Sequence, residues 1–141
     1  MTNNTIEIET TIMFNFLSKQ IKTFRKAVLK YNQNTNEFIR AGINTLEQEF
    51  LATQDLGDIC VNSIANKVKY TLLNIAHDIC FGYHTHILDY SSKDLTFFAS
   101  IIAIKENIED SIRNFEILTT KNSDMKKDGT VAHYRITASN E

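Results

Sequence analysis

The chain of 141 residues contains no proline and only four glycines. Proline in a helix interior removes a backbone donor and clashes with the preceding turn, which costs about 3 kcal/mol. A chain without it can therefore form long uninterrupted helices, whereas turn-rich β folds depend on proline and glycine. We predict an all-α fold, an antiparallel bundle of three or four long amphipathic helices.

The first helical segment extends from about residue 7 to about residue 54. Its apolar residues recur at steps of 3, 4, 3, 4 and 3, which places them on one face of a helix: Phe14, Leu17, Ile21, Phe24, Val28 and Tyr31. An Asn-rich stretch at residues 32–36 interrupts this pattern, because Asn competes for backbone hydrogen bonds. The pattern resumes in a shifted register at Phe38, Ile39, Ile43, Leu46 and Phe50. Both a bend in one helix and a break between two helices remain open.

A second helical segment follows the Asp55-Leu56-Gly57-Asp58 break. The side chain of Asp55 can cap a new helix, and Asp58 would then lie in its first turn. The apolar stripe comprises Val61, Ile64, Val68, Leu72, Ile75 and Ile79, and it continues less regularly to Tyr90. Gly82 weakens this part of the helix by about 1 kcal/mol relative to Ala.

The third helical segment begins at Ser91-Ser92-Lys93-Asp94, which matches the capping-box pattern. Its broad apolar face comprises Leu95, Phe98, Ile101, Ile104, Ile108, Ile112, Phe115 and Leu118. Additional apolar residues at Phe97, Ile102 and Ala103 make the first half apolar on most sides. That half is either central in the core or a contact surface.

The apolar pattern ends at Thr119, and Asp128-Gly129 is a turn signal. Residues 131–137 could form a short strand, but the sequence offers no second strand to pair with it. We therefore predict a helical bundle domain at residues 1–118 and a mobile, flexible C-terminal tail at residues 119–141.

Composition excludes several classes of protein. A net charge of −2 does not indicate nucleic-acid binding. Cys60 and Cys80 do not make a disulfide framework. No secretory signal and no apolar run of roughly 20 residues is present, so we expect no transmembrane segment and a cytoplasmic location. The nucleophile motif Gly-x-Ser-x-Gly and phosphate-binding glycine loops are missing, and we expect no enzyme activity and no cofactor.

His77, Cys80 and His84 could share one helical face, and nitrogen and sulfur ligands suit zinc. They lack an evident fourth ligand. Over metal binding we favour a structural role, in which His77 and Cys80 line a helix interface while His84 and His86 are exposed near the helix end. No His follows a Glu by three positions, which argues against a di-iron bundle. A basic line on the first helix, made of Lys19, Lys22, Lys26 and Lys30 with Arg25 beside it, is best explained as a solvated face.

Residues 50–79, FLATQDLGDICVNSIANKVKYTLLNIAHDI, resemble the junction between two helices in the phasins, proteins that coat polyhydroxyalkanoate storage granules in bacteria. Phe50-Leu51-Ala52 is similar to the end of the first phasin helix, and Asp55 to the acidic residue at the break. The resemblance covers about residues 14–90. Leu56 stands where family members often carry proline, alanine is scarcer than in phasins, and the helix from Leu95 has no counterpart in the family.

The resemblance implies a non-enzymatic structural protein that coats hydrophobic polymer granules through amphipathic helices. Candidate surface-binding residues are Phe97, Phe98, Ile101 and Ile102, or the stripe from Phe14; core packing is the alternative for each. We also expect a homo-oligomer, because three helices alone would leave apolar surface exposed. The alternative function is a helical protein–protein interaction module, such as a secretion accessory protein, an effector or a viral helical-bundle antagonist.

Overall fold

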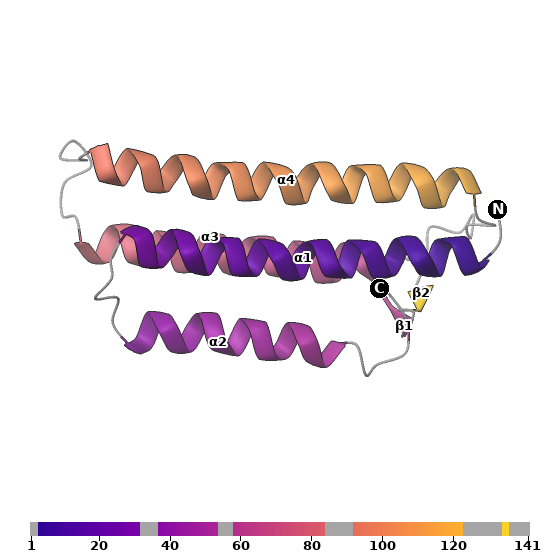
Figure 1. The fold of residues 1–141 in the computed structure, drawn as a ribbon, viewed down its shortest axis with the longest axis horizontal. Helices are drawn as coiled ribbons and strands as arrows, with labels where there is room; N and C mark the ends of the chain where they lie inside the picture. The colour runs from indigo at the N-terminus through magenta and orange to yellow at the C-terminus, as the bar shows by residue number, and fades with distance from the viewer. Residues whose placement is uncertain (1–2, 32–36, 54–57, 84–91, 123–133, 136–141) are drawn as a thin grey trace.

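In the part of the chain that the computed structural model describes, four helices form an antiparallel bundle, which confirms the predicted all-α fold (Figure 1). The structure describes residues 3–31, 37–53, 58–83, 92–122 and 134–135. The helices are α1 (Asn3–Tyr31), α2 (Glu37–Ala52), α3 (Val61–Tyr83) and α4 (Ser92–Asn122), and the strands are β1 (Asp58–Ile59) and β2 (Tyr134–Arg135). Each helix runs antiparallel to the one before it.

The helix α1 packs against all three other helices. Figure 1 shows α1 and α3 overlapping in the middle, with α4 and α2 on opposite sides. The helix α2 has 16 residues and α1 has 29, so α2 covers only part of the length of α1. The arrangement therefore has a long α1–α3–α4 unit with a shorter fourth helix along one side.

The predicted apolar stripe of α1 forms the centre of the core. Every member from Phe14 to Tyr31 is buried, and Phe24 is 0% exposed. The ring of Phe14 stacks on the ring of Phe50 from α2, with 4.2 Å between their centroids. The stripe prediction for α1 is thus confirmed residue by residue.

The sequence left open whether residues 32–36 bend one helix or separate two. These residues lie outside the described part, but the helices on either side answer the question. α1 ends at Tyr31, and α2 begins at Glu37 and runs back along α1 (Figure 1). The two are separate helices. The buried face of α2 consists of Ile39, Ile43, Leu46 and Phe50, whereas Phe38 is 80% exposed. Including Phe38 in the stripe was wrong, because it lies at the first turn, one position before the buried face begins.

The helix α3 begins later than predicted, at Val61 rather than just after Asp55. Its first turn is closed at Cys60, whose carbonyl accepts a hydrogen bond from the Ile64 amide at 3.1 Å. The strand β1 occupies Asp58–Ile59, so Asp58 is not in the first helical turn. The proposed cap Asp55 lies outside the described residues, as does the predicted continuation of the helix from residue 84 to residue 90.

The C-terminal part also differs from the prediction. The helix α4 continues to Asn122, past the expected end at Leu118. The strand β2 pairs antiparallel with β1, with Ile59 opposite Tyr134, so the short strand does have a partner. The rest of the predicted tail lies outside the described residues. Within the described helices, none combines the length and the apolar character needed to cross a bilayer.

Candidate contact surface

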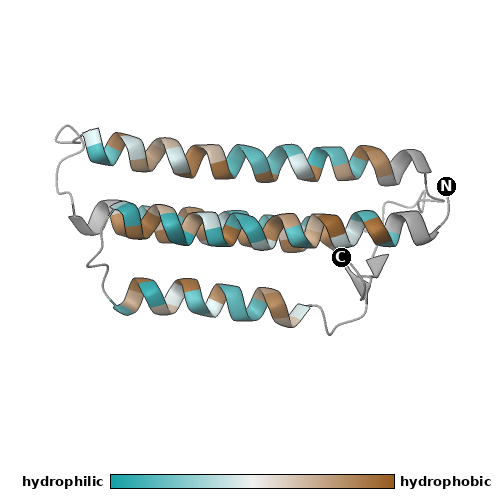
Figure 2. Cartoon of the chain, viewed as in Figure 1, coloured by the Kyte–Doolittle hydropathy of each residue, from teal (hydrophilic) through white to brown (hydrophobic). Residues whose placement is uncertain are grey.

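The two halves of α4 differ in chemistry. Residues 95–104 contain no charged side chain, whereas the following turns carry Lys105, Glu106, Glu109, Asp110, Arg113 and Glu116. In Figure 2 brown and pale bands predominate along the first half of α4, and teal bands are more frequent in the second. We call residues 95–104 the charge-free half. A helix segment that is apolar on most sides either lies centrally in the core or forms a contact surface.

The four predicted surface-binding residues differ in how far the structure buries them. Phe97 and Ile101 are 3% and 6% exposed and belong to the core, and Phe98 is half-buried and packs against that core. Only Ile102, at 54% exposure, lies on the surface. Phe97 and Ile101 are thus not available for surface binding in this fold, because their side chains continue the buried face made by Ile104 and Ile108. The alternative of core packing holds for these two residues.

A short apolar surface lies on the other side of the charge-free half. Leu95 is 58% exposed, Ala99 and Ile102 are exposed, and Phe98 is half-buried beside them. Their spacing of three or four residues places them in one line along the helix. We call these four residues the outer strip. Single exposed apolar residues are ordinary on protein surfaces, whereas apolar residues that lie side by side form a candidate contact surface.

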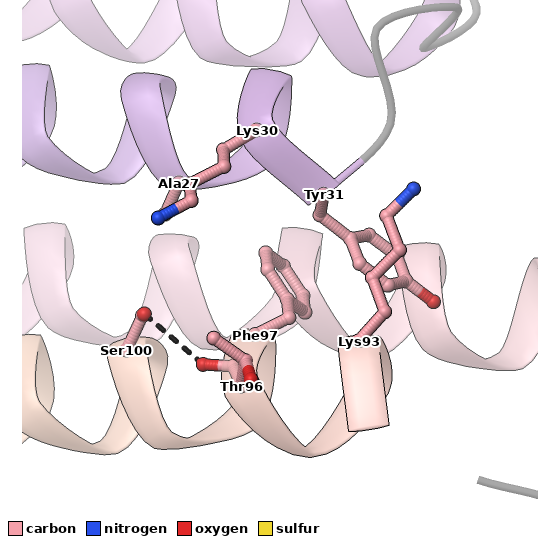
Figure 3. A pocket seen from close by; sticks show the side chains of 7 residues that line it. All are labelled: Ala27, Lys30, Tyr31, Lys93, Thr96, Phe97 and Ser100. Atoms are coloured by element: carbon pink, nitrogen blue, oxygen red, sulfur yellow. Dashed lines mark hydrogen bonds between the residues drawn. The ribbon is translucent and has the colours of Figure 1, made fainter. Parts of the chain in front are cut away.

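A pocket of about 180 Å³ lies between the last turns of α1 and the first turns of α4 (Figure 3). Its apolar side includes Ala27 and the rings of Tyr31 and Phe97, which stack with 4.5 Å between their centroids. The Lys93 ammonium group lies 5.6 Å from the centre of the Tyr31 ring, and Lys30 reaches the pocket from α1. The pocket combines an aromatic wall with two positive charges.

The polar residues of this pocket have their hydroxyl hydrogens directed at the backbone of α4. The Thr96 hydroxyl donates to the Ser92 carbonyl at 2.9 Å, and the Ser100 hydroxyl donates to the Thr96 carbonyl at 3.1 Å. Their oxygen atoms remain able to accept hydrogen bonds. Beside the pocket, the Tyr31 hydroxyl donates to the buried carboxylate of Asp94. The capping-box pattern pointed to Asp94, but nothing in the sequence pointed to Tyr31 as its partner.

An open groove of about 400 Å³ lies near the other end of the α1–α4 pair. Its apolar lining is Ile12, Met13, Phe16, Phe115 and Leu118, with Glu9, Ser111 and Asn114 at its polar positions. Ile12 is 54% exposed, and Ile8 one turn earlier is 45% exposed. The groove is therefore a second apolar surface, separate from the outer strip.

A charged cluster joins α3 to the second half of α4. The ammonium groups of Lys69 and Lys105 each lie 3.1 Å from a carboxylate oxygen of Glu109. These hydrogen bonds, first from Lys105 and then from Lys69, lower the pKa of Glu109 below its usual value. Lys69 is 8% exposed, so its charge depends on Glu109 for compensation. The cluster therefore has a structural role, which the sequence pattern did not reveal.

The metal hypothesis on α3 gains no support from the described residues. The His77 ring is exposed and lies 3.9 Å from the Asp78 carboxylate, so the expectation that His77 lines a helix interface was wrong. His84, His86 and the side chain of Cys80 are outside the described part. Among the residues that the structure describes, no three His, Cys, Asp or Glu side chains gather around a possible metal position.

The basic line on α1 faces solvent, as expected for a hydrated face. Lys19, Lys22, Lys26 and Lys30 are all exposed, and Arg25 lies 3.7 Å from Glu47 of α2.

Comparison of the whole chain with protein families, with curated proteins and with solved structures finds no match.

Proposed function

We propose that this chain is a non-enzymatic binding protein that attaches to a hydrophobic surface through the outer strip of α4. The observation that supports the proposal is the charge-free half of α4, which buries Phe97 and Ile101 while it leaves Leu95 and Ile102 more than half exposed. One side of this half packs in the core of the bundle. On the other side, Leu95 and Ile102 contact the hydrophobic surface. The bundle stays closed when it binds.

The outer strip is short, which limits the affinity of a single copy of the chain for a surface. Full burial of a Leu or Ile side chain contributes about 1.5–3 kcal/mol, so one strip binds a surface weakly. Several linked copies bind far more tightly, because each further contact is intramolecular. The proposal therefore includes a homo-oligomer, with the basic line and the charged half of α4 facing water.

The resemblance to phasins suggests which surface this is. A cytoplasmic polyhydroxyalkanoate granule offers an extended hydrophobic polymer, and adsorption to it scales with the apolar area buried. The similarity of residues 50–79 to the phasin helical junction supports this part of the proposal. Attachment of this kind needs no catalytic residue, cofactor or metal.

The second candidate is a protein–protein interaction module. The open groove between α1 and α4 favours it, because Ile8 and Ile12 lie exposed beside a concave apolar lining. A groove of this kind suits the apolar face of a partner helix. The groove and the outer strip share no residue, so substitutions can separate the two candidates.

Adsorption of the purified full chain to polyhydroxyalkanoate particles tests the first candidate, with cellulose particles and lipid vesicles as controls. The informative variant is Leu95→Ser/Ile102→Ser, since both side chains are exposed and the bundle does not depend on them. Serine at Ile101 would instead place a hydroxyl group in the core. The matched control is Phe38→Ser, which removes an exposed aromatic ring from α2, away from the strip.

We expect selective binding to the polymer, a loss of at least about tenfold in affinity for the double variant, and no loss for Phe38→Ser. Circular dichroism checks that all variants keep their helicity. A folded chain that does not bind the polymer would refute the first candidate. Polymer binding that is lost with Ile8→Ser/Ile12→Ser, and kept with the strip variant, would refute the outer strip as the attachment site and would place the polymer contact at the groove.

A further inference from the structure

We propose that the pocket between α1 and α4 binds a small aromatic carboxylate, a molecule with one ring and one negative charge. The pocket lies on a different side of α4 from the outer strip, so the proposal is independent of the attachment to a hydrophobic surface. Four features of the pocket lead to it: its size, its aromatic wall, its two ammonium groups and the orientation of its hydroxyl groups.

The size of the pocket limits the ligand. Its volume is about 180 Å³, below the roughly 300–1,000 Å³ that drug-sized ligands and cofactors occupy. An apolar cavity of about 150 Å³ is large enough for benzene. One aromatic ring with a single substituent fits this volume, and a nucleotide or a coenzyme does not.

The wall of the pocket favours a flat apolar body. Phe97 and Tyr31 are buried and stack on one another, and Ala27 leaves room beside them because its side chain is a single methyl group. Aromatic rings gain about 0.5–1.5 kcal/mol from such neighbours beyond the effect of burial. Figure 3 shows the Phe97 ring between the two helices, with Ala27 and Lys30 on the opposite side of the pocket.

The charges at the pocket favour an anion. Lys30 and Lys93 both line it, and among the described residues no carboxylate lies within ion-pair distance of either ammonium group. The nearby Asp94 does not line the pocket, and its carboxylate already accepts the Tyr31 hydroxyl. In Figure 3 the Lys30 ammonium lies on the same side of the pocket as Ser100, while Lys93 extends along the Tyr31 ring.

The hydroxyl groups refine the choice of ligand. Thr96 and Ser100 donate their hydrogens to backbone carbonyls, so in this arrangement their oxygen atoms act as acceptors toward the pocket. The carboxylate therefore binds to lysine, with Lys30 as the principal partner. A hydroxyl group at the end of the ligand ring away from the carboxylate could donate to the Thr96 oxygen, one helical turn from Ser100. We expect 4-hydroxybenzoate to bind at least as tightly as benzoate.

The test is a titration of the full ¹⁵N-labelled chain, followed by the backbone amide signals of Ala27, Thr96 and Ser100. The probes are benzoate, 4-hydroxybenzoate, benzyl alcohol, benzylamine and inorganic phosphate. We expect benzoate to bind with a Kd of about 1 mM or tighter and to shift these amides. Benzyl alcohol should bind more weakly, and benzylammonium and phosphate should not bind.

Three variants connect binding to the pocket. Lys30→Met removes the charge and keeps the length of the side chain, and we expect benzoate to bind about tenfold more weakly while benzyl alcohol is unaffected. Ala27→Leu fills the pocket and should abolish binding of both. Lys22→Met, on an exposed lysine outside the pocket, should change neither. Three results would each overturn the proposal. The amide signals could stay unshifted at a benzoate concentration of about 10-fold the expected Kd, benzylamine could bind as tightly as benzoate, or Lys30→Met could leave the Kd for benzoate unchanged.

Discussion

The hydroxyl of Tyr31, in the last turn of α1, donates a hydrogen bond to the carboxylate of Asp94, in the first turn of α4. Both residues are buried, with exposures of 8% and 2%. A buried carboxylate needs hydrogen-bond donors, and the amide groups at a helix N-terminus also favour a negative charge. The contact therefore connects the two longest helices at one end of the bundle.

Replacement of Tyr31 by Phe removes this donor and keeps the stacking on Phe97. We expect the free energy of unfolding to fall by about 1–3 kcal/mol, because the Asp94 carboxylate loses one of its hydrogen bonds without regaining water. Urea unfolding followed by circular dichroism measures it. The matched control is Tyr70→Phe, which removes a hydroxyl from a residue that is 58% exposed. Equal stability of the two variants would contradict the role assigned to Tyr31.

The helical periodicity of the sequence predicted the buried faces of α1 and α2 well, because each has charged or polar residues on its other side. The first half of α4 is different. Residues 95–104 are uncharged, so the sequence allowed a face through Leu95 and Phe98 as readily as the observed one through Phe97. The packing of Phe97 on Tyr31 of a distant helix selects between them. Local sequence contains no information about that contact.

The features of the sites that escaped prediction also depend on distant contacts. Lys69 follows the stripe residue Val68 in the chain, and only the approach of α4 brings Glu109 within reach of its ammonium group. The β1–β2 pair joins Ile59 to Tyr134, far apart in the chain and only two residues long, so it leaves no periodic pattern. The pocket exists because Lys30 and Ser100 come from antiparallel helices.

Two phenylalanines on α2 test the phase of that helix. Phe50 is 3% exposed and stacks on Phe14, whereas Phe38 is 80% exposed. We expect Phe50→Ala to lower the free energy of unfolding by about 3–5 kcal/mol, since it leaves a cavity in the core. Phe38→Ala should change it by less than about 0.5 kcal/mol. Similar losses for both variants, measured by urea unfolding, would mean that α2 is rotated relative to the structure.

Gly42 offers a stabilising substitution. It lies inside α2, where a Cβ atom would meet the Ile75 side chain at 3.8 Å, an ordinary van der Waals distance. Alanine favours a helix interior over glycine by about 0.8–1 kcal/mol. We therefore expect Gly42→Ala to raise the free energy of unfolding by about 0.5–1 kcal/mol and to raise the thermal midpoint. A loss of stability would show that α2 and α3 are closer together than described.

The Lys105–Glu109–Lys69 cluster predicts how stability depends on pH. The folded state lowers the pKa of Glu109 below its unfolded value of about 4.3, so the unfolded state binds more protons between the two values. The contribution of Glu109 is therefore fully present above about pH 4.3 and is lost as the pH falls through the folded pKa. Urea unfolding at a series of pH values measures this loss.

Two variants identify the group responsible. Glu109→Gln removes the titrating carboxyl group, and Lys105→Met removes the hydrogen bond that lowers its pKa most. We expect both variants to lose less stability than the wild type when the pH is lowered below about 4.3. A wild-type slope in Glu109→Gln would assign the acid sensitivity to another carboxyl group.

The most direct test of the central claim, that α4 uses opposite faces to close the bundle and to attach, uses the absence of tryptophan from the chain. Ile102→Trp places a single reporter in the outer strip, and Asn107→Trp places one at another exposed position of α4. Fluorescence with an aqueous quencher is measured with and without polyhydroxyalkanoate particles. We predict that the particles shift the emission of Ile102→Trp to the blue and shield it, while Asn107→Trp stays accessible. A bound Ile102→Trp that remains accessible would contradict the claim, because the chain would then attach through another surface, either the groove between α1 and α4 or the core stripe of an opened bundle.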